Sequence, residues 1–496
     1  MIRFPMGFCR LIRYYHGPKG RESNAIAINY NLVARSWTGW AAERKESDKM
    51  RLQEEVYEAY REHINSHMEE NRSGAFKMKT ALEHSQLFYN GVLDKTVHIP
   101  KVFDTETTEH FQRIVTTTYG IFGKVINEYR KNGEYRKLFP FSKELEELIL
   151  LPAPYEGFLP IARMDLFYHE DTGEFKFCEI NTDGTAAMIR DYEIRKALIN
   201  NPAHQAVIRS FELKPFELFD TWAETFLSLY QTYPKRVDRP NVAIVDFLEN
   251  ATLREFEEFA RRFQEAGVNC EICDIRLLKY KNGTLYSPEG NRIDAIYRRA
   301  VTADIMSDYA SVTDFLNAVR EDAVFFAGAF ETQLIHTKWL FYVLHHDLTK
   351  AFLTDEEYSF VKEHIPLTLE LCKEYISPEE VCEKKDSFIL KPMDAYASKG
   401  IYASGREFTD KDWEKLVREL YGKGYICQEY CEQYMKDNID FAWGDGEWHP
   451  YINMPGLYTY NGVFRGILMR TCCEENIIVA HENERTLPVF TVTGKR

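Results

Sequence analysis

Short apolar strands alternate with helical segments in the middle of the chain, and this order strongly limits the possible fold. Val242–Phe247 is an apolar run typical of a buried strand, and Val268–Ile275 predicts the next strand. Between them lies an apolar stripe with helical spacing, with Thr252 and Glu255 predicted to form a capping box and Gly267 to end the helix. Strands joined through helices in this way are typical of a parallel sheet, so we expect an α/β unit.

Further strand signals extend this region. The Asn282-Gly283 pair predicts a tight hairpin turn, because both residues tolerate the positive φ that such turns need. Ile293–Tyr297 and Ala323–Ala327 are predicted strands with a helix between them. The longest uncharged apolar run, Ala323–Phe330, is much shorter than the ~18 residues that span a bilayer, so we expect no transmembrane helix.

The overall composition limits the size, partners and compartment of the protein. Its 496 residues correspond to about three domains, and the net charge of −15 argues against non-specific binding to nucleic acids or anionic lipids. Ten cysteines are scattered without a disulfide pattern, which fits a reducing cytosol. We therefore expect a cytoplasmic protein without nucleic-acid or membrane partners. The pattern of predicted helices and strands divides the chain into the regions 1–154, 155–235, 236–332 and 333–496.

Helical patterns dominate the first of these regions. Apolar stripes at three- and four-residue spacing run over 52–68 and 111–126, and a shorter helical stretch covers 143–150. In the next region, 155–235, a further long helical stretch is expected to end at about Tyr230. The N-terminal region carries no recognisable catalytic pattern, so we interpret it as a mainly helical region.

Two local cysteine spacings have more than one interpretation. Cys270 and Cys273 form a CxxC pair, but no second pair lies at zinc-ribbon distance and Cys270 falls in a predicted strand. Packing in the core is the favoured interpretation, and a metal or redox role is the alternative. The same holds for the adjacent Cys472 and Cys473.

A hairpin near residue 170 is well predicted. The β-rich segments Ala162–Tyr168 and Phe175–Ile180 flank the turn residues Asp171-Thr172-Gly173. Aromatic side chains make both strands strongly apolar, so charged groups on them would need a partner.

Four polar side chains occur at alternate positions of this hairpin. Successive side chains of a strand face opposite sides, so Arg163 and Asp165 share one face of the first strand. Glu179 and Asn181 likewise share one face of the return strand. Strand pairing can bring two carboxylates, an amide oxygen and a guanidinium together. Such oxygen ligands suit Mg²⁺. A surface hairpin with solvated charges is the alternative.

A second polar stretch begins at the end of an apolar strand, Phe388–Leu390. Lys391 closes this strand, and a loop of small residues follows with Ser398, Lys399 and Gly400. Backbone amides and ammonium groups in such a loop can face a phosphate. Taken alone, an ordinary turn with exposed lysines is the better interpretation.

The third stretch is the predicted strand Ile426–Tyr430. It ends in Gln428, Glu429 and Tyr430, whose backbone groups could meet an adenine edge. By itself this pattern indicates only a buried edge strand.

Taken together, the three stretches resemble the ATP-grasp fold, in which two α+β subdomains hold ATP between them. In that family a Lys-Pro strand and loop cover the phosphates, a strand like Gln-Glu-Tyr supports adenine, and a Glu-x-Asn strand binds magnesium. Here Glu179-Ile180-Asn181 precedes Lys391, whereas common members have the opposite order. This order resembles the circularly permuted branch. The details from about residue 155 to the C-terminus, including the strand ending at Arg470, are similar to the synthetase domain of glutathionylspermidine synthase.

The resemblance implies a multidomain protein of the α/β and α+β classes. The helical region 1–154 would precede an ATP-grasp part, 155–235, that carries the metal-binding hairpin. A pre-ATP-grasp-like α/β domain would occupy 236–332, and 333–496 would form the ATP-grasp part with the nucleotide-binding lysines and phosphate loop.

The resemblance also implies roles for the matching residues. The Mg²⁺ ligands would be Asp165, Glu179 and Asn181. The residues around ATP would be Lys338, Lys391, Ser398, Lys399, Gly400, Gln428, Glu429 and Tyr430. Arg163 and Arg470 would stabilise negative charge on the reacting groups, as always-charged planar donors can. For Lys338 and Arg470 a solvated surface position is the alternative.

The expected function is therefore an ATP-dependent carboxylate–amine ligase. ATP would phosphorylate a small-molecule or peptide carboxylate, and an amine would then attack the acyl phosphate to form an amide, with release of ADP and phosphate. The predicted loop Asp394–Gly400 contains one glycine, fewer than is usual in the family, so a catalytically silent ATP-binding or scaffold protein is the alternative. A peptide-binding protein without ATP affinity is the third possibility.

Overall fold

The computed structural model describes residues 50–89, 92–182, 184–393, 400–403, 408–473, 478 and 483–496. Ser398 and Lys399 of the predicted phosphate loop lie outside the described residues. Among the described residues, no helix is both long and apolar enough to cross a membrane.

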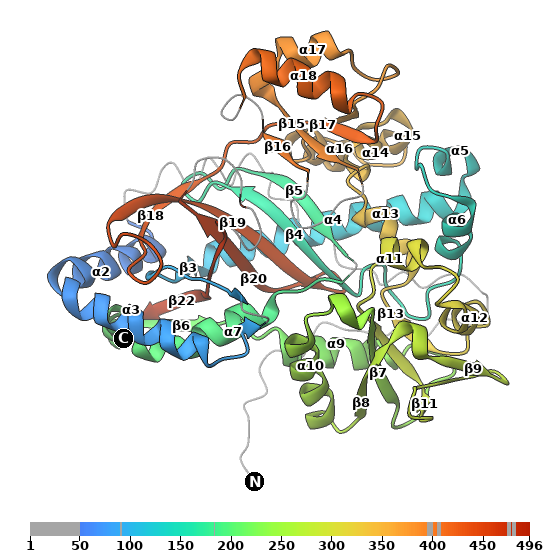
Figure 1. Ribbon diagram of the computed structural model, residues 1–496, viewed down its shortest axis with the longest axis horizontal. Coiled ribbons are helices and arrows are strands. Elements are labelled where there is room, and N and C mark those ends of the chain that lie inside the picture. Colours follow the sequence, from blue (N-terminus) through green and yellow to red (C-terminus); the bar gives the residue numbers. More distant parts are fainter. Residues whose placement is uncertain are drawn as a thin grey trace.

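The predicted parallel sheet is confirmed. Four strands lie in the order β13-β12-β7-β8, and all neighbours are parallel. Their bounds are β7 (Asn241–Asp246), β8 (Asn269–Asp274), β12 (Ala295–Arg298) and β13 (Phe325–Ala327). The amphipathic helix α10 (Leu253–Glu265) connects β7 to β8 and packs on the sheet. Figure 1 shows this unit at the lower right of the molecule, with α9 (Phe219–Tyr230), α10 and α12 (Thr313–Arg320) around the sheet.

The capping box predicted at Thr252 is wrong. The side chain of Thr252 makes no capping hydrogen bond. Glu255 is instead fully buried and accepts hydrogen bonds from Arg299 (3.1 Å) and from the backbone of Ile189 (3.2 Å). A buried carboxylate is far more stable beside a guanidinium than beside a neutral backbone amide, so the tertiary partner prevails over the local motif.

The Asn282-Gly283 turn is confirmed. It joins β9 (Lys279–Lys281) to β10 (Thr284–Tyr286), and β11 (Arg292–Ile293) completes a three-stranded antiparallel sheet. Both turn residues have positive φ, 51° for Asn282 and 75° for Gly283, as a two-residue hairpin requires.

An antiparallel sheet of six strands forms the centre of the molecule. Its order is β21-β20-β19-β4-β5, with β18 paired to β19. The strands are β4 (Ile161–Tyr168), β5 (Phe175–Asn181), β18 (Met435–Ile439), β19 (Trp448–Tyr460), β20 (Val463–Cys472) and β21 (Arg485–Leu487). The long helix α4 (Thr105–Lys131) packs against β19 and β20. The hairpin β4–β5 confirms the prediction, whereas β19 was not predicted.

A smaller antiparallel sheet stands above the hairpin at the top of Figure 1. Its order is β14-β17-β15-β16, with bounds β14 (Thr368–Glu370), β15 (Phe388–Pro392), β16 (Tyr402–Ala403) and β17 (Tyr425–Glu429). Phe388 and Leu390 share a separate apolar core with residues such as Trp413 of α18 (Asp410–Leu420). The alternate residues of β15 therefore face the other way, toward the central sheet.

Distant parts of the chain form a further sheet, in the order β3-β22-β6. Its strands are β3 (Lys101–Asp104), β6 (Phe211–Pro215) and β22 (Val489–Lys495). The helices α2 (Leu52–Ser66), α4 and α6 (Lys143–Ile149) confirm the three predicted stripes. The long helical stretch expected to end at Tyr230 is wrong in part, because β6 separates α7 (Met188–Ala197) and α8 (Pro202–Ser210) from α9.

Candidate functional site

The hairpin β4–β5 places its four polar side chains opposite one another. Arg163 is paired with Asn181, and Asp165 with Glu179. A register shift follows Asp165, as in a β-bulge. Bulges next to functional sites commonly change the direction of a side chain. Here Leu166 pairs with Phe177, so one residue of β5 between Phe177 and Glu179 is left unpaired.

Asp165 is fully buried at the centre of this cluster. Arg163 donates two hydrogen bonds to it, from Nε to Oδ1 (2.7 Å) and from Nη2 to Oδ2 (3.0 Å). Arg470 Nη2 (2.7 Å) and Asn181 Nδ2 (3.2 Å) also donate to Oδ2. Two guanidinium groups therefore hold this one carboxylate through charge-assisted hydrogen bonds.

Arg470 is not a solvated arginine. It lies on β20, paired with Met454 of β19, and its side chain is 15% exposed. The pairing across three adjacent strands aims it at the carboxylate of Asp165.

Glu179 lies within the field of four basic side chains. Burial by itself favours the neutral acid, yet these cations lower the pKa of Glu179 to about 2. In decreasing order of effect they are Lys338, Arg470, Lys391 and Arg163. Lys338 lies in the turn between α13 (Gln333–His336) and α14 (Leu340–His345), and Lys391 lies on β15. Segments far apart in the sequence therefore converge on one carboxylate.

Lys391 is held in place by its neighbour strand. It is buried, and its Nζ donates to Gln428 Oε1 on β17 at 2.8 Å. Gln428 in turn donates to Thr368 Oγ1 at 2.9 Å. The side chain of Gln428 thus orients the lysine, a function that the sequence pattern did not indicate.

A cavity of about 400 Å³ opens at the end of β17. Glu429 and Tyr430 line it on one side, and Phe167 and Lys176 of the central sheet line it on the other. Lys176 Nζ lies 3.5 Å from Glu429 Oε1 and so connects the two sheets. Gly400, the described end of the predicted phosphate loop, has φ of 70° and packs against Tyr425 rather than in this cavity.

Two residues of β19 that the sequence analysis missed complete the cluster. A Cβ atom at Gly456 would lie 2.4 Å from Asp165 Oδ1, so only glycine allows β19 to pass there. Tyr458 is buried and donates to Ala186 O (2.6 Å), the same carbonyl that Arg163 Nη1 contacts (3.2 Å). A glycine inside an apolar strand is a known signal of close approach, and it was available at position 456.

The CxxC pair does not have the properties of a redox site. Cys270 and Cys273 lie on β8, three residues apart, so their side chains face opposite sides of the strand. Burial raises the pKa of both thiols, that of Cys273 to about 12. Reactive cysteines need an accessible thiolate, so neither residue has that character.

Comparison with known proteins supports the fold. The chain is similar to a glutathione synthetase-like effector from Globodera pallida, with a TM-score of 0.54 and 12% identity over 84% of this chain and 96% of that one. The overall fold is ATP-grasp-like. A second match, D-alanyl-alanine synthetase A from Vibrio cholerae, has a TM-score of 0.24 at 10% identity and covers 51% of this chain and 89% of that one. No family model and no curated protein matches the sequence.

Proposed function

We propose that this protein is an ATP-dependent carboxylate–amine ligase of the circularly permuted ATP-grasp type, similar to glutathionylspermidine synthase. The reaction would form an amide and release ADP and phosphate. The fold likeness supports the architecture alone, and the side chains of the site support the chemistry.

The charge balance of the cluster carries this proposal. Four cations, Arg163, Arg470, Lys338 and Lys391, surround the carboxylates of Asp165 and Glu179. Guanidinium and ammonium groups gathered at one place are suited to binding phosphate oxygens. A nucleotide triphosphate with bound Mg²⁺ remains anionic and matches these donors.

The donor set also fits magnesium. Glu179 offers a carboxylate that is ionised at neutral pH and accepts a hydrogen bond from Asn181 Nδ2 at 3.3 Å. Glu179 and Asn181 would hold the ion, and Asp165 would join them when its arginines turn toward phosphate. Mg²⁺ prefers such oxygen ligands together with water and phosphate, and when bound it would neutralise charge on the transferred phosphoryl group.

The nucleotide would lie between the two sheets. Lys391, fixed by Gln428, and Lys338 would contact its phosphates, and the loop that includes Ser398, Lys399 and Gly400 would cover them. The cavity beside Glu429 and Tyr430 has a volume of about 400 Å³, which is within the usual range for small-molecule sites. We assign it to the base.

The two guanidinium groups would act where the phosphoryl group is transferred from ATP to the substrate carboxylate. Arg163 and Arg470 are oriented by Asp165 and would stabilise the charge that develops on the phosphoryl group and the carboxylate. The substrates would be a small-molecule or peptide carboxylate and an amine, without nucleic acid or membrane.

The decisive experiment measures ADP release with mixed carboxylates and amines. Glu179→Gln keeps the shape of the side chain but removes its charge, so we expect ADP release to fall at least about 100-fold, the size of effect seen for charge-stabilising groups. Glu224→Gln, an exposed glutamate of α9, is the matched control and should retain full activity.

The same experiment separates the alternatives. Native ADP release by Glu179→Gln would refute the assignment of the site. A wild-type chain that binds ATP but shows no substrate-stimulated ADP release would indicate a silent ATP-binding protein.

A further inference from the structure

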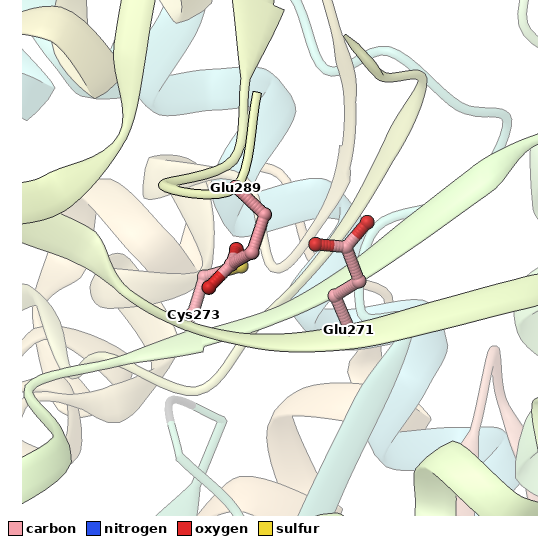
Figure 2. Close-up of side chains that lie close together, drawn as sticks. All are labelled: Glu271, Cys273 and Glu289. Carbon is pink, nitrogen blue, oxygen red and sulfur yellow. The ribbon is translucent and has the colours of Figure 1, made fainter. Parts of the chain in front are cut away.

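A cluster of one thiol and two carboxylates lies between β8 of the parallel sheet and the turn that follows β10, apart from the proposed ligase site (Figure 1). Its members are Glu271, Cys273 and Glu289. Their potential ligand atoms all lie within 4.8 Å of one another. Figure 2 shows Glu271 and Cys273 on the same strand, with Glu289 reaching over them from a facing loop and its carboxylate next to the sulfur of Cys273.

Strand geometry accounts for two of the three ligands. Glu271 and Cys273 are two residues apart on β8, so both side chains project from the same face. Cys270 projects from the other face, which excludes a chelate by the CxxC pair itself. The CxxC motif therefore lies on the strand that carries the site, but Cys273 shares the site with Glu271 and not with Cys270.

The third ligand comes from a rigid turn. Glu289 lies between β10 and β11, in a turn closed by hydrogen bonds from Ser287 N to Asn291 O (2.8 Å) and from Gly290 N to Ser287 O (2.9 Å). Gly290 has φ of 87°, a conformation that fixes the turn and suits glycine. The turn holds Glu289 above the strand although its side chain is exposed.

Cys273 provides an independent indication of a ligand. Its side chain is 1% exposed, and among the described residues it forms no disulfide. The sulfur nevertheless faces two carboxylates rather than apolar side chains alone. A buried sulfur beside two carboxylates offers the soft and hard donor atoms that a zinc-like cation takes.

We propose that Glu271, Cys273 and Glu289 form a binding site for a thiophilic divalent cation, best matched by Zn²⁺. Zinc takes thiolate and carboxylate ligands in a tetrahedron, with Zn–S of about 2.3 Å and Zn–O of about 2.0–2.2 Å. Ligands at these distances lie roughly 3.3–3.7 Å apart, which the two flexible glutamates reach by small rotations. A water molecule would complete the coordination.

A neighbouring amide supports the arrangement. Asn291 Nδ2 donates to Glu271 Oε1 at 2.9 Å and so orients this carboxylate, as residues behind metal ligands commonly do. Bound zinc would connect the edge strand β8 to the turn between β10 and β11. The site would be structural, because it lies on a different sheet from the cluster around Asp165.

The test is a titration of the chelator-treated full-length chain with Co²⁺, which takes the place of Zn²⁺ and absorbs light when a thiolate binds it. We expect one equivalent of Co²⁺ per chain with a thiolate charge-transfer band, displaced by Zn²⁺ but not by excess Mg²⁺. Binding should also release a proton, because the thiol must ionise. The absence of this band in the native chain would overturn the proposal.

Variants assign the band to these residues. Cys273→Ser should abolish it, and Asn291→Ala should weaken Co²⁺ binding about 10-fold, the lower end of the range for such supporting residues. Cys270→Ser, on the opposite face of the same strand, is the control and should leave binding unchanged. Persistence of the band in Cys273→Ser, or its loss in Cys270→Ser, would contradict the assignment.

Glu289→Gln keeps the test decisive if the buried Cys273 variant fails to fold. Glu289 is exposed in its turn, so its replacement should leave the fold intact while Co²⁺ binding weakens by more than about 10-fold. Unchanged affinity in Glu289→Gln would exclude the three-ligand site. Mg²⁺-dependent ADP release should remain unaffected in this variant, so the outcome is independent of the proposed ligase function.

Discussion

The missing side chain at Gly456 lets β19 pass directly beside the charged pair of β4. A Cβ atom there would also lie 2.9 Å from Arg163 Cδ, besides the 2.4 Å approach to Asp165. Gly456→Ala should therefore lower the free energy of unfolding by about 1–3 kcal/mol, as overpacking does, and should reduce ADP release because it displaces both side chains.

Urea unfolding and the ADP assay check this prediction. Gly494→Ala is the control, since a Cβ at this position in β22 would meet nothing within 4 Å. Equal effects of the two substitutions would show that the close approach at Gly456 is unimportant.

His204 makes the stability of the protein depend on pH. Burial lowers its pKa from 6.5 to about 4, while its Nδ1 is hydrogen-bonded with Tyr60 Oη at 2.7 Å. Between about pH 6.5 and 4 the unfolded chain binds a proton at this residue that the folded chain does not. The contribution to stability is therefore complete above pH 6.5 and is lost as the pH falls.

We expect the stability difference between the wild type and His204→Gln to shrink by up to about 1.4 kcal/mol per pH unit in this window. Parallel urea titrations from about pH 7 to about pH 5 measure it. A constant difference across the window would contradict a neutral, buried His204.

Among the elements, β22 depends most on distant partners. It pairs in parallel with β3 and antiparallel with β6, so one C-terminal strand joins two segments from the first half of the chain. Val492 is fully buried in this sheet, whereas the adjacent Thr493 is exposed.

Val492→Ala should reduce the free energy of unfolding by about 2 kcal/mol, because it removes buried methyl groups at a strand junction. Thr493→Ala should change it by less than about 0.5 kcal/mol. Thermal unfolding of both variants gives the comparison, and similar losses would mean that the interior face of β22 contributes little.

The 13-residue central strand β19 was not predicted from the sequence. Pro455 and Gly456 argue locally against a strand. However, β18 pairs with β19 only through Ile452, and β4 pairs with it only from Gly456 onward. The backbone N–H of Asn453 donates to Tyr434 O at 2.9 Å, on the edge of β19 that faces β18 and β4. The backbone of Pro455, two residues further on, faces the same edge. Its missing N–H therefore falls in the gap between the end of the pairing with β18 and the start of the pairing with β4.

For the whole molecule, the central expectation is that one triphosphate contacts two sheets. A non-hydrolysable ATP analogue with Mg²⁺, present at about 100 times its dissociation constant, should stabilise the wild type by about 2.7 kcal/mol. Lys391→Met should abolish this stabilisation at the same ligand concentration, because the buried ammonium group is lost from the site.

Differential scanning fluorimetry with and without the analogue measures the effect. Lys423→Met, on an exposed turn before β17, is the control and should respond like the wild type. An undiminished thermal shift in Lys391→Met would show that the nucleotide does not bind between the sheets.

Local patterns were sufficient for features that depend on near neighbours. The alternation in β4 and β5, the turn at Asn282-Gly283 and the strand–helix order of the parallel sheet all follow from side-chain direction and backbone preference within about ten residues. The same alternation was enough to predict that Arg163 shares a face with Asp165, and Glu179 with Asn181.

Features that depend on distant partners were decided only by the tertiary structure. Glu255 binds Arg299 instead of capping its own helix. Strand β19 accommodates Pro455 because its pairings with β18 and β4 end on either side of this residue. Cys273 lies next to Glu289, and not next to Cys270. The approach of Lys338 and Lys391 to Glu179 is of the same kind. Local patterns in the sequence predict which side chains share one face of a strand such as β4 or β5. Which of those groups meet depends on the folded chain, because a buried charge is stabilised by whatever opposite charge packing brings near, regardless of its distance along the chain.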